Sequence, residues 1–381
     1  MSRAGRPRLL VDATPLVAPR LTGVGRVLLG ILGALDSDEV AQQIEVLLVV
    51  PRAERALVDR FAFRTLRTRA VPLPPRAWSA LTLLPGVVGI DLLLGPGSYF
   101  FPNFRAWPVS RARSRSFVFV HDVCFAVMPE LVPRERREML ARSMPRWLAG
   151  SDLALTGTPS SARELESALG VSPDRVRVLP TTIDGGVFHP RSESEVEQAR
   201  RRHRLQRYVL FVGSIERRKN LVTLVDAYRR AVHPPGHTLL LVGGDGWDNA
   251  DVHDAVTRAR AAGVDVRFAE QYVSDEELPA LLTGADAVAM PSWHEGFGLP
   301  ALEAVACGTR VLAADIPGLR DALRDREADA DFVDPGDVEA WSRALEQAIA
   351  HPRRAHHGDI RGWGEAAGAL VELTLRAPGP H

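Results

Sequence analysis

Pro291-Ser-Trp-His-Glu-Gly-Phe-Gly-Leu-Pro-Ala-Leu-Glu303 is the most informative segment of this 381-residue chain. The apolar run before it predicts a buried strand that ends at Met290, and Pro300 suits the first position of a helix. Between the strand and the helix, a glycine-bearing loop presents free backbone N–H groups at the positive end of the helix. Such a loop is a ready binding site for a diphosphate or for the oxygen of a sugar.

Two carboxylates, Glu295 and Glu303, flank this predicted anion site. Glu295 belongs to the loop, and we expect Glu303 in the first turn of the helix. Carboxylates so close to a phosphate would repel it unless they faced hydroxyl groups, so sugar and ribose hydroxyls are their natural ligands. The alternative is that Glu303 only complements the helix dipole, which is worth about 0.3–1 kcal/mol. The spacing, the glycines and Pro300 together favour the binding site.

A second informative segment, Phe211-Val-Gly-Ser-Ile-Glu-Arg-Arg-Lys-Asn220, predicts the same strand–loop–helix arrangement. We expect Gly213 to allow a close backbone approach, and Arg218 and Lys219 to neutralise a diphosphate leaving group. A basic loop alone is usually a solvated turn, but Lys219 is the single lysine among 47 basic residues. Because a flexible ammonium and a planar guanidinium are not interchangeable, the chemistry of this position favours lysine. Chance survival of one lysine is the alternative.

Short apolar runs alternate with helical patterns along the chain, which predicts mostly parallel sheets covered by helices on both faces. In the first half the expected strands are Arg8–Asp12, Ile44–Val50, Gly89–Leu94, Ser116–His121, Leu153–Thr156 and Arg175–Leu179, and the helices are Val27–Leu35 and Arg134–Ala149. In the second half the strands are Tyr208–Gly213, Thr238–Gly243, Val264–Phe268, Ala287–Met290 and Arg310–Ala313, and the helices are Leu221–Ala231, Asp251–Ala262, Glu276–Thr283 and Pro300–Cys307.

This alternation, in a chain too long for one ordinary core, predicts an α/β protein of two doubly wound, Rossmann-like domains. We place the first domain at 1–185, a polar linker with a short helix at 186–207, the second domain at 208–358 and a closing helical segment at 359–381. Two such domains in tandem predict a cleft, where the carboxyl ends of both sheets can face one ligand.

The composition is that of a soluble globular protein, with 46% hydrophobic and 25% charged residues. Proline, glycine and aspartate interrupt the longest apolar stretch, so no membrane span is expected. Two distant cysteines, Cys124 and Cys307, argue against a disulfide framework or a zinc site and suit a cytoplasmic protein. Residues 1–190 carry 24 arginines against 17 acidic residues, whereas residues 191–381 carry 23 basic against 30 acidic residues. The basic half predicts an anionic partner, and drift of solvated faces is the equal alternative.

The two acids Glu295 and Glu303, set around Glu-Gly-Phe-Gly-Leu-Pro, resemble the signature of glycosyltransferase family 4, retaining enzymes of the GT-B fold. The resemblance extends from near Val11 to the last helix. It implies that Glu303 holds the donor ribose, that Glu295 contacts the transferred sugar, and that the acceptor binds mostly to the first domain. The backbone amides expected to support sugar and phosphate are those of Gly296, Phe297, Gly298 and Leu299.

The loop after Tyr208–Gly213 resembles the diphosphate-binding element of the family, in which Lys219 matches the lysine. Many members place an arginine directly after the glycine, where this chain has Ser214. The sequence leaves open whether Arg217 or Arg218 supplies that guanidinium. The Glu-x-Arg-Lys-Asn form is similar to the mannosyltransferase-like branch of the family.

Further site residues are implied by this resemblance. Leu21-Thr-Gly-Val-Gly-Arg26, by itself only a tight loop, matches a glycine loop that faces the donor phosphates and the acceptor, which assigns Gly23 and Gly25. His121, at the end of a strand, matches a histidine that approaches the reacting sugar, and the aspartate after it can orient its ring. Val273 matches a residue that contacts the nucleotide base through its backbone.

The predicted activity moves a hexosyl group from a nucleotide-diphosphate sugar to a hydroxyl acceptor, with the anomeric configuration retained. By the resemblance, the leaving diphosphate helps to deprotonate the acceptor. GDP-mannose is the first donor expected, and UDP- or dTDP-sugars are next. No cofactor and no metal are expected, because we expect no Asp-x-Asp motif and Lys219, Arg218 and the helix end can take the place of a metal.

The acceptor class is a glycan, a lipid-linked molecule or a small natural product. Arginines of the first domain are expected to meet anionic lipid at the inner face of the membrane, whereas no nucleic-acid motif accompanies them. These are Arg64, Arg67, Arg69, Arg111, Arg113 and Arg115. The alternatives are a nucleotide-sugar epimerase or a phosphorylase on the same fold, and a non-catalytic nucleotide-binding homologue.

Overall fold

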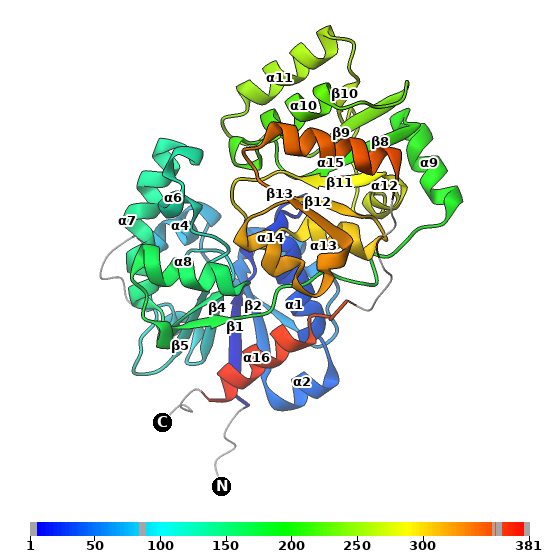
Figure 1. The fold of residues 1–381 in the computed structure, drawn as a ribbon. Helices are drawn as coiled ribbons and strands as arrows, with labels where there is room; N and C mark the ends of the chain where they lie inside the picture. Colours follow the sequence, from blue (N-terminus) through cyan, green and yellow to red (C-terminus); the bar gives the residue numbers. More distant parts are fainter. Residues whose placement is uncertain (1–5, 84–88, 353–354, 356–359, 377–381) are drawn as a thin grey trace. The chain divides into compact units, whose positions relative to one another are not determined.

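The computed structural model describes residues 6–83, 89–352, 355 and 360–376. The contacts within the chain divide it into two compact units (Figure 1). Unit 1 consists of Met1–Val127, Arg134–Thr182 and Gly362–His381, and unit 2 of Met128–Pro133 and Ile183–Arg361. The last residues of the predicted closing segment, 377–381, lie outside the described residues.

Unit 1 is built on a sheet of seven parallel strands in the order β3-β2-β1-β4-β5-β6-β7. The strands are β1 (Arg8–Asp12), β2 (Glu45–Pro51), β3 (Arg67–Val71), β4 (Ser98–Phe101), β5 (Arg115–Phe119), β6 (Leu153–Thr156) and β7 (Val176–Val178). The direction of winding reverses between β1 and β4. In a doubly wound sheet, ligands bind outside the carboxyl ends of the strands at such a switch point.

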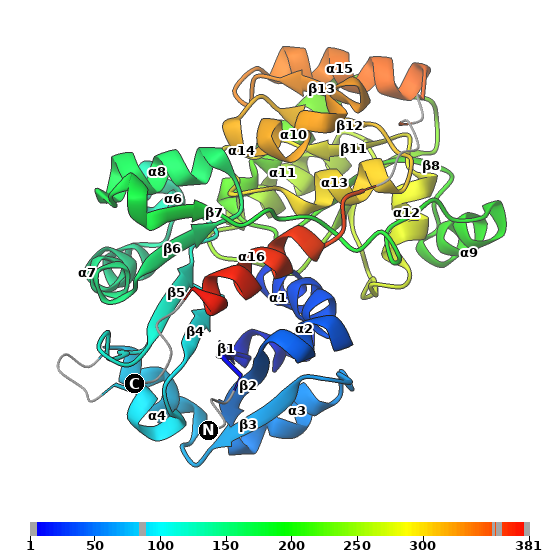
Figure 2. The ribbon, with the colours of Figure 1, turned by 90° about the horizontal axis from the view of Figure 1, so that it is seen from below.

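Helices cover both faces of this sheet (Figure 2). They are α1 (Gly23–Leu35), α2 (Asp38–Gln43), α3 (Arg55–Asp59), α4 (Pro75–Ala80), α5 (Asp91–Leu94), α6 (Cys124–Val127), α7 (Arg134–Gly150), α8 (Pro159–Leu169) and α16 (Gly364–Leu375). The last of these, α16, packs on α1. A Cβ added to Gly30 would lie 2.2 Å from the indole of Trp363, so the close approach of the two helices requires a glycine there.

Two predictions for unit 1 are wrong. The expected loop Leu21–Arg26 is mostly helical, because helix α1 begins at Gly23. Thr22 is the N-cap residue of α1, and its side chain accepts a hydrogen bond from Gly25 N. The expected strand Gly89–Leu94 is the short helix α5. Leu92 and Leu93 are 60% and 49% exposed, whereas a central strand of a parallel sheet is buried on both faces.

Two strands of unit 1 escaped the prediction. Strand β4 follows α5 as a fully buried run, Ser98–Phe101. Strand β3, at the edge of the sheet, alternates exposed arginines with less exposed residues, so it lacks the continuous apolar pattern of a central strand.

Unit 2 is built on six parallel strands in the order β10-β9-β8-β11-β12-β13. They are β8 (Arg207–Val212), β9 (His237–Val242), β10 (Val266–Phe268), β11 (Ala287–Met290), β12 (Val311–Ala314) and β13 (Ala330–Val333). The first five lie within two residues of the predicted ranges, and β13 was not predicted. The doubly wound α/β prediction is confirmed for both units.

The helices of unit 2 are α9 (Glu193–His203), α10 (Leu221–Arg230), α11 (Ala250–Ala261), α12 (Leu278–Gly284), α13 (Leu299–Ala306), α14 (Pro317–Ala322) and α15 (Val338–Ala350). A capping box formed by Ser192 and Glu195 begins α9 inside the predicted linker. The sheet of unit 2 switches its winding direction between β8 and β11. Both informative segments of the sequence follow these two neighbouring strands.

Candidate functional site

The candidate site in unit 2 is formed where the loops after β8 and β11 meet. The loop after β8 leads into a short 3-10 helix over Arg217–Lys219, and the loop after β11 leads into α13. The backbone joins the two loops, because Trp293 N donates to the carbonyl oxygen of Arg218 at 3.0 Å. The carboxyl ends of two adjacent parallel strands therefore bring residues some 75 positions apart in the sequence side by side.

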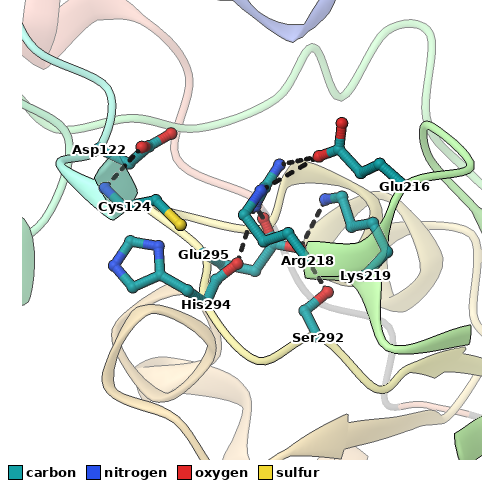
Figure 3. A network of polar contacts seen from close by, with 8 residues as sticks. All are labelled: Asp122, Cys124, Glu216, Arg218, Lys219, Ser292, His294 and Glu295. Carbon is teal, nitrogen blue, oxygen red and sulfur yellow. Dashed lines mark hydrogen bonds and ion pairs between the residues drawn. The ribbon is translucent and has the colours of Figure 1, made fainter. Parts of the chain in front are cut away.

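Glu295 is the centre of a buried polar network (Figure 3). Its Oε1 accepts from Lys219 Nζ at 2.6 Å and from Ser292 Oγ at 2.6 Å, and its Oε2 accepts from Arg218 Nη1 at 3.0 Å. Glu295 and Lys219 are each 7% exposed. Burial raises the pKa of Glu295, but the charges of Lys219 and Arg218 and the hydrogen bonds from Lys219 and Ser292 lower that pKa to about 2. The carboxylate is therefore ionised at neutral pH.

Asn220 ties a third loop to the other two. Its Nδ2 donates to the carbonyl oxygens of Pro291 at 3.0 Å and Pro335 at 2.7 Å, which follow β11 and β13. Asn220 has a positive φ of 54°, a conformation that asparagine tolerates better than most residues. The residue after Lys219 thus fixes the three loops that border the site.

Glycine is required where backbones approach most closely. Gly298 has a φ of +95° as the N-cap of α13, and an added Cβ would lie 2.5 Å from Leu319 Cδ2. A Cβ on Gly243, at the end of β9, would lie 1.7 Å from the carbonyl oxygen of Gly213. A Cβ on Gly213 itself would lie 3.6 Å from Lys219 Cε. Glycine is thus required by close packing at Gly298 and Gly243, whereas a side chain at Gly213 would be in ordinary contact with Lys219.

Glu303 lies on α13, just past the first turn in which it was predicted. The helix begins at Leu299, so Glu303 is its fifth residue and the first turn holds no acidic side chain. Glu303 is 1% exposed. Cys307 lies one helical turn after Glu303, and its N donates to the Glu303 carbonyl oxygen at 3.0 Å. Burial, and after it the charge of Glu303, raise the pKa of the Cys307 thiol to about 12. The helix-dipole interpretation of Glu303 is weakened, because the dipole effect falls off beyond the first turn.

The other predicted residues of unit 2 lie in these loops. Phe297, Leu299 and Val273 are partly buried against the core of unit 2, and Ser214 directly follows Gly213 at the end of β8. Val273 lies between β10 and α12. Gly296 and Phe297 belong to the loop that precedes α13. Their roles toward a ligand stay predictions.

His121, Gly23 and Gly25 belong to unit 1. His121 follows β5, and its Nε2 lies 2.8 Å from the carbonyl oxygen of Pro102. Burial lowers the pKa of His121, so the neutral imidazole is favoured. The Asp122 carboxylate accepts from Cys124 N at 3.0 Å (Figure 3), and its orientation of the His121 ring stays a prediction.

Gly23 and Gly25 lie in the first turn of α1 rather than in a loop. A Cβ on Gly25 would lie 2.9 Å from the carbonyl oxygen of Pro15. Packing within unit 1 is therefore sufficient reason for this glycine, and a ligand contact stays a prediction.

The prediction missed several residues of the network: Glu216, Asn220, Ser292, His294 and Gly318. Glu216 is buried and accepts from the Arg218 guanidinium, and the carbonyl oxygen of His294 accepts from Arg218 Nη1 at 2.8 Å. An acid placed between a strand end and three basic residues was a signal for Glu216. Ser292 bonds to Glu295 three residues away, whereas Asn220, His294 and Gly318 contact partners farther along the chain.

No three His, Cys, Asp or Glu side chains gather as metal ligands within the described ranges. The expectation of no Asp-x-Asp motif is wrong, because the chain carries two such pairs. Arg64 is bonded to the acids of Asp36-Ser-Asp38, and Arg310 to Asp331 of Asp329-Ala-Asp331. Helices long and apolar enough to cross a bilayer are absent from the part of the chain that the structure describes.

A charged network of this kind can serve two chemical functions. The Lys219 ammonium and the positive end of α13 can receive an anion, and the Glu295 carboxylate can accept bonds from hydroxyl groups. These are the groups that a phosphorylated sugar requires.

Comparison with known proteins agrees with this chemistry. The sequence model of the family "Glycosyl transferases group 1" matches residues 194–361. O-antigen chain mannosyltransferase B of Escherichia coli is 30% identical over 276 residues, which cover 70% of this chain and 69% of that protein. D-inositol 3-phosphate glycosyltransferase of Xylanimonas cellulosilytica is 30% identical over 267 residues, which cover 66% of this chain and 63% of that protein. The chain thus spans less than two thirds of the length of this second relative.

Among solved structures, Anabaena HepE in complex with UDP-glucose superposes with a TM-score of 0.64 at 17% identity. The match covers 97% of this chain and 95% of HepE, and at this identity it shows the fold alone. The predicted GT-B architecture is confirmed by such neighbours and by the two parallel-sheet units. With the E. coli relative and the family model, these findings establish that the chain belongs to the group 1 glycosyltransferases, enzymes that transfer a sugar.

Proposed function

We propose that the protein is a retaining hexosyltransferase that uses a nucleotide-diphosphate sugar as donor and a hydroxyl group as acceptor. The observation that carries the proposal is the contact of 2.6 Å between Lys219 Nζ and Glu295 Oε1. It places the only lysine of the chain and an ionised carboxylate together at the switch point of unit 2. A cation for the diphosphate and an acceptor for sugar hydroxyls are thus adjacent.

On the donor side, Lys219 and the backbone N–H groups at the start of α13 neutralise the diphosphate. Glu295 accepts bonds from the transferred sugar, and Glu303 from the ribose. The backbone of Val273 contacts the base. These roles follow from the resemblance, and the position of Glu295 in the loop before α13 and of Glu303 on that helix supports them.

The proposed reaction breaks the bond between the anomeric carbon and the diphosphate oxygen on the face where the acceptor oxygen attacks. The proton of the acceptor hydroxyl passes to the departing diphosphate oxygen. Glu295 is a poor candidate for a nucleophile, because two cations and Ser292 hold its carboxylate and keep its pKa at about 2. This supports a front-face route, in which Lys219 stabilises the developing charge of the leaving group.

GDP-mannose, from which mannose would be transferred, is the donor that we test first. Support comes from the Glu216-x-Arg218-Lys219-Asn220 form of the loop and from the E. coli relative, whose name is that of a mannosyltransferase. The Anabaena structure holds UDP-glucose, so UDP-sugars are tested next, followed by dTDP- and ADP-sugars.

A thermal-shift screen over these nucleotide sugars tests the proposal. The true donor is expected to raise the melting temperature, because a ligand that binds only the folded state stabilises it by RT ln(1 + [L]/Kd). Donor consumption is then followed with and without candidate acceptors. Loss of donor with a change of sugar but no transfer would identify an epimerase, and no response to any nucleotide sugar would contradict the proposal.

We also propose a cytoplasmic enzyme whose unit 1 meets anionic lipid or a lipid-linked acceptor. The predicted basic residues Arg67 and Arg69 are exposed on edge strand β3, which supports this. Other arginines of the set are engaged within unit 1: Arg64 pairs with Asp38, and Arg115 with Asp152. Salt-sensitive binding to anionic vesicles is the expected result, and its absence would exclude the membrane contact.

A further inference from the structure

Glu216 is a buried carboxylate to which the proposed function gives no role. It lies in the loop after β8, and only 2% of it is exposed. Its Oε1 accepts from Nε and Nη2 of Arg218 at 3.1 Å and 2.8 Å. Because burying a carboxylate costs free energy unless it is paired, the position of Glu216 is explained by the group that it holds.

The backbone around Glu216 is held on both sides. Ile215 N donates to the carbonyl oxygen of Gly244 at 2.9 Å, and Gly246 N donates to the carbonyl oxygen of Ile215 at 2.9 Å. A Cβ on Gly246 would lie 2.9 Å from Glu216 Cβ and 3.0 Å from its Oε2. The carboxylate is therefore confined between the glycine-rich loop after β9 and Arg218.

The other edge of the Arg218 guanidinium faces the loop after β11. Its Nη1 donates to Glu295 Oε2 at 3.0 Å and to the carbonyl oxygen of His294 at 2.8 Å (Figure 3). Four contacts of the guanidinium are thus with protein oxygen atoms. A guanidinium has five N–H groups in a rigid plane, so these contacts leave little of it for a diphosphate.

We propose that Glu216 and Arg218 form a brace for Glu295. Glu216 orients the guanidinium, and the guanidinium holds the Glu295 carboxylate in place for a sugar hydroxyl. Arg218 is then a positioning residue rather than a diphosphate ligand, and Lys219 with the start of α13 receives the diphosphate. This inference rests on the proposed function for the role of Glu295. It assigns Arg218, the second arginine of the loop, to Glu295 rather than to the diphosphate.

The test compares Arg218→Ala, Glu216→Ala, Glu216→Gln and the double variant Glu216→Ala/Arg218→Ala. Turnover is expected to fall at least tenfold in Glu216→Ala and in Arg218→Ala, and to stay within about threefold of wild type in Glu216→Gln, which retains an acceptor for the guanidinium. The double variant is expected to be no slower than Arg218→Ala, because residues that act as one unit are not additive.

Asp248→Asn is the matched control. Asp248 forms an exposed pair with Arg217 at 3.8 Å, which joins the same two loops as Glu216 and Gly246. Loss of this ion pair in Asp248→Asn is expected to leave turnover unchanged, because exposed ion pairs contribute little to stability.

Calorimetric titration with GDP and UDP separates the brace from a phosphate contact. If Arg218 only holds Glu295 in place, the affinity of Arg218→Ala for the nucleoside diphosphate is expected to stay within about threefold of wild type while its turnover falls. A tenfold or greater loss of that affinity would make Arg218 a diphosphate ligand and overturn the inference. Wild-type turnover in Glu216→Ala, or a double variant whose losses multiply, would overturn it as well.

Crystal structures of the Glu216 variants test the brace without turnover. The Glu295 carboxylate is expected to shift in Glu216→Ala and to keep its place in Glu216→Gln, and an unmoved carboxylate in both would overturn the inference. A wild-type protein that transfers no sugar would refute the proposed function, whereas these structures would still decide on the brace.

Discussion

Gly318 and Glu295 touch through their main chains. A Cβ added to Gly318 would lie 1.9 Å from the carbonyl oxygen of Glu295. Gly318 belongs to the first turn of α14, so the start of this helix abuts the loop that presents the carboxylate. The position of Glu295 therefore depends on a steric contact with α14 as well as on its ion pairs.

Gly318→Ala is expected to displace the Glu295 loop. Overpacking of this kind costs about 1–3 kcal/mol of unfolding free energy, and turnover should fall at least tenfold because the carboxylate moves. Denaturant unfolding and steady-state kinetics measure the two effects. Gly368→Ala in α16 is the control, because nothing lies within 4 Å of its Cβ position, and alanine there should stabilise by about 0.5–1 kcal/mol. Equal behaviour of the two variants would contradict the contact.

Lys219→Ala is expected to lose most turnover while the fold survives. The loss should be about a hundredfold or more, because one donor to the developing charge is removed. Lys219→Arg should not restore activity, since a planar guanidinium cannot take the place of an ammonium 2.6 Å from Glu295 Oε1. Circular dichroism and the melting temperature check the fold. Near-wild-type turnover in the alanine variant would remove Lys219 from the site.

Glu303→Ala is expected to weaken nucleotide binding by about tenfold, or about 1.4 kcal/mol, because the ribose loses an acceptor. Glu303→Gln keeps the side-chain volume at this buried position and separates the loss of charge from a cavity. Isothermal calorimetry with the nucleoside diphosphate measures both. Glu372→Ala, on the exposed face of α16, is the control. An unchanged affinity in both Glu303 variants would exclude the ribose role.

Asp12, at the carboxyl end of β1, predicts a pH dependence of stability. Burial raises the pKa of Asp12 from 3.8 to about 6, against the opposing bonds from Thr14. Between pH 3.8 and 6 the folded state keeps a proton on Asp12 that the unfolded state has lost. The contribution of Asp12 to the free energy of unfolding is therefore largest below pH 3.8 and declines as the pH rises to 6. The decline amounts to at most about 3 kcal/mol.

Asp12→Asn should abolish that part of the decline and make the variant the more stable protein at pH 8. The Thr14 hydroxyl can turn to accept a bond from the new amide, so the local contacts survive. Urea unfolding of both proteins at pH 4, 6 and 8 measures the difference. Parallel stability curves would show that Asp12 titrates at its ordinary pKa.

Local physical chemistry accounts for much of what could be predicted. Glycine, proline and short apolar runs mark where strands end and helices begin, so β1, β6 and β11 have their predicted bounds. The chemistry of Lys219 and Glu295 was also readable, because residue type alone supplies an ammonium and a carboxylate in loops that follow strands. Periodicity failed at α5, whose apolar run resembles a strand until the exposure of its leucines is known.

The contacts that complete the site have no local signature. Lys219 meets Glu295 because β8 and β11 are neighbours in the sheet, although two strands and three α-helices lie between β8 and β11 along the chain. Gly318 contacts Glu295 from the first turn of α14, and the Glu216–Arg218 pair contacts it from the loop that also carries Lys219. Residue types supply the charges, but the strand order brings the carboxyl ends together, and a contact between distant loops depends on that order rather than on any pattern within one segment.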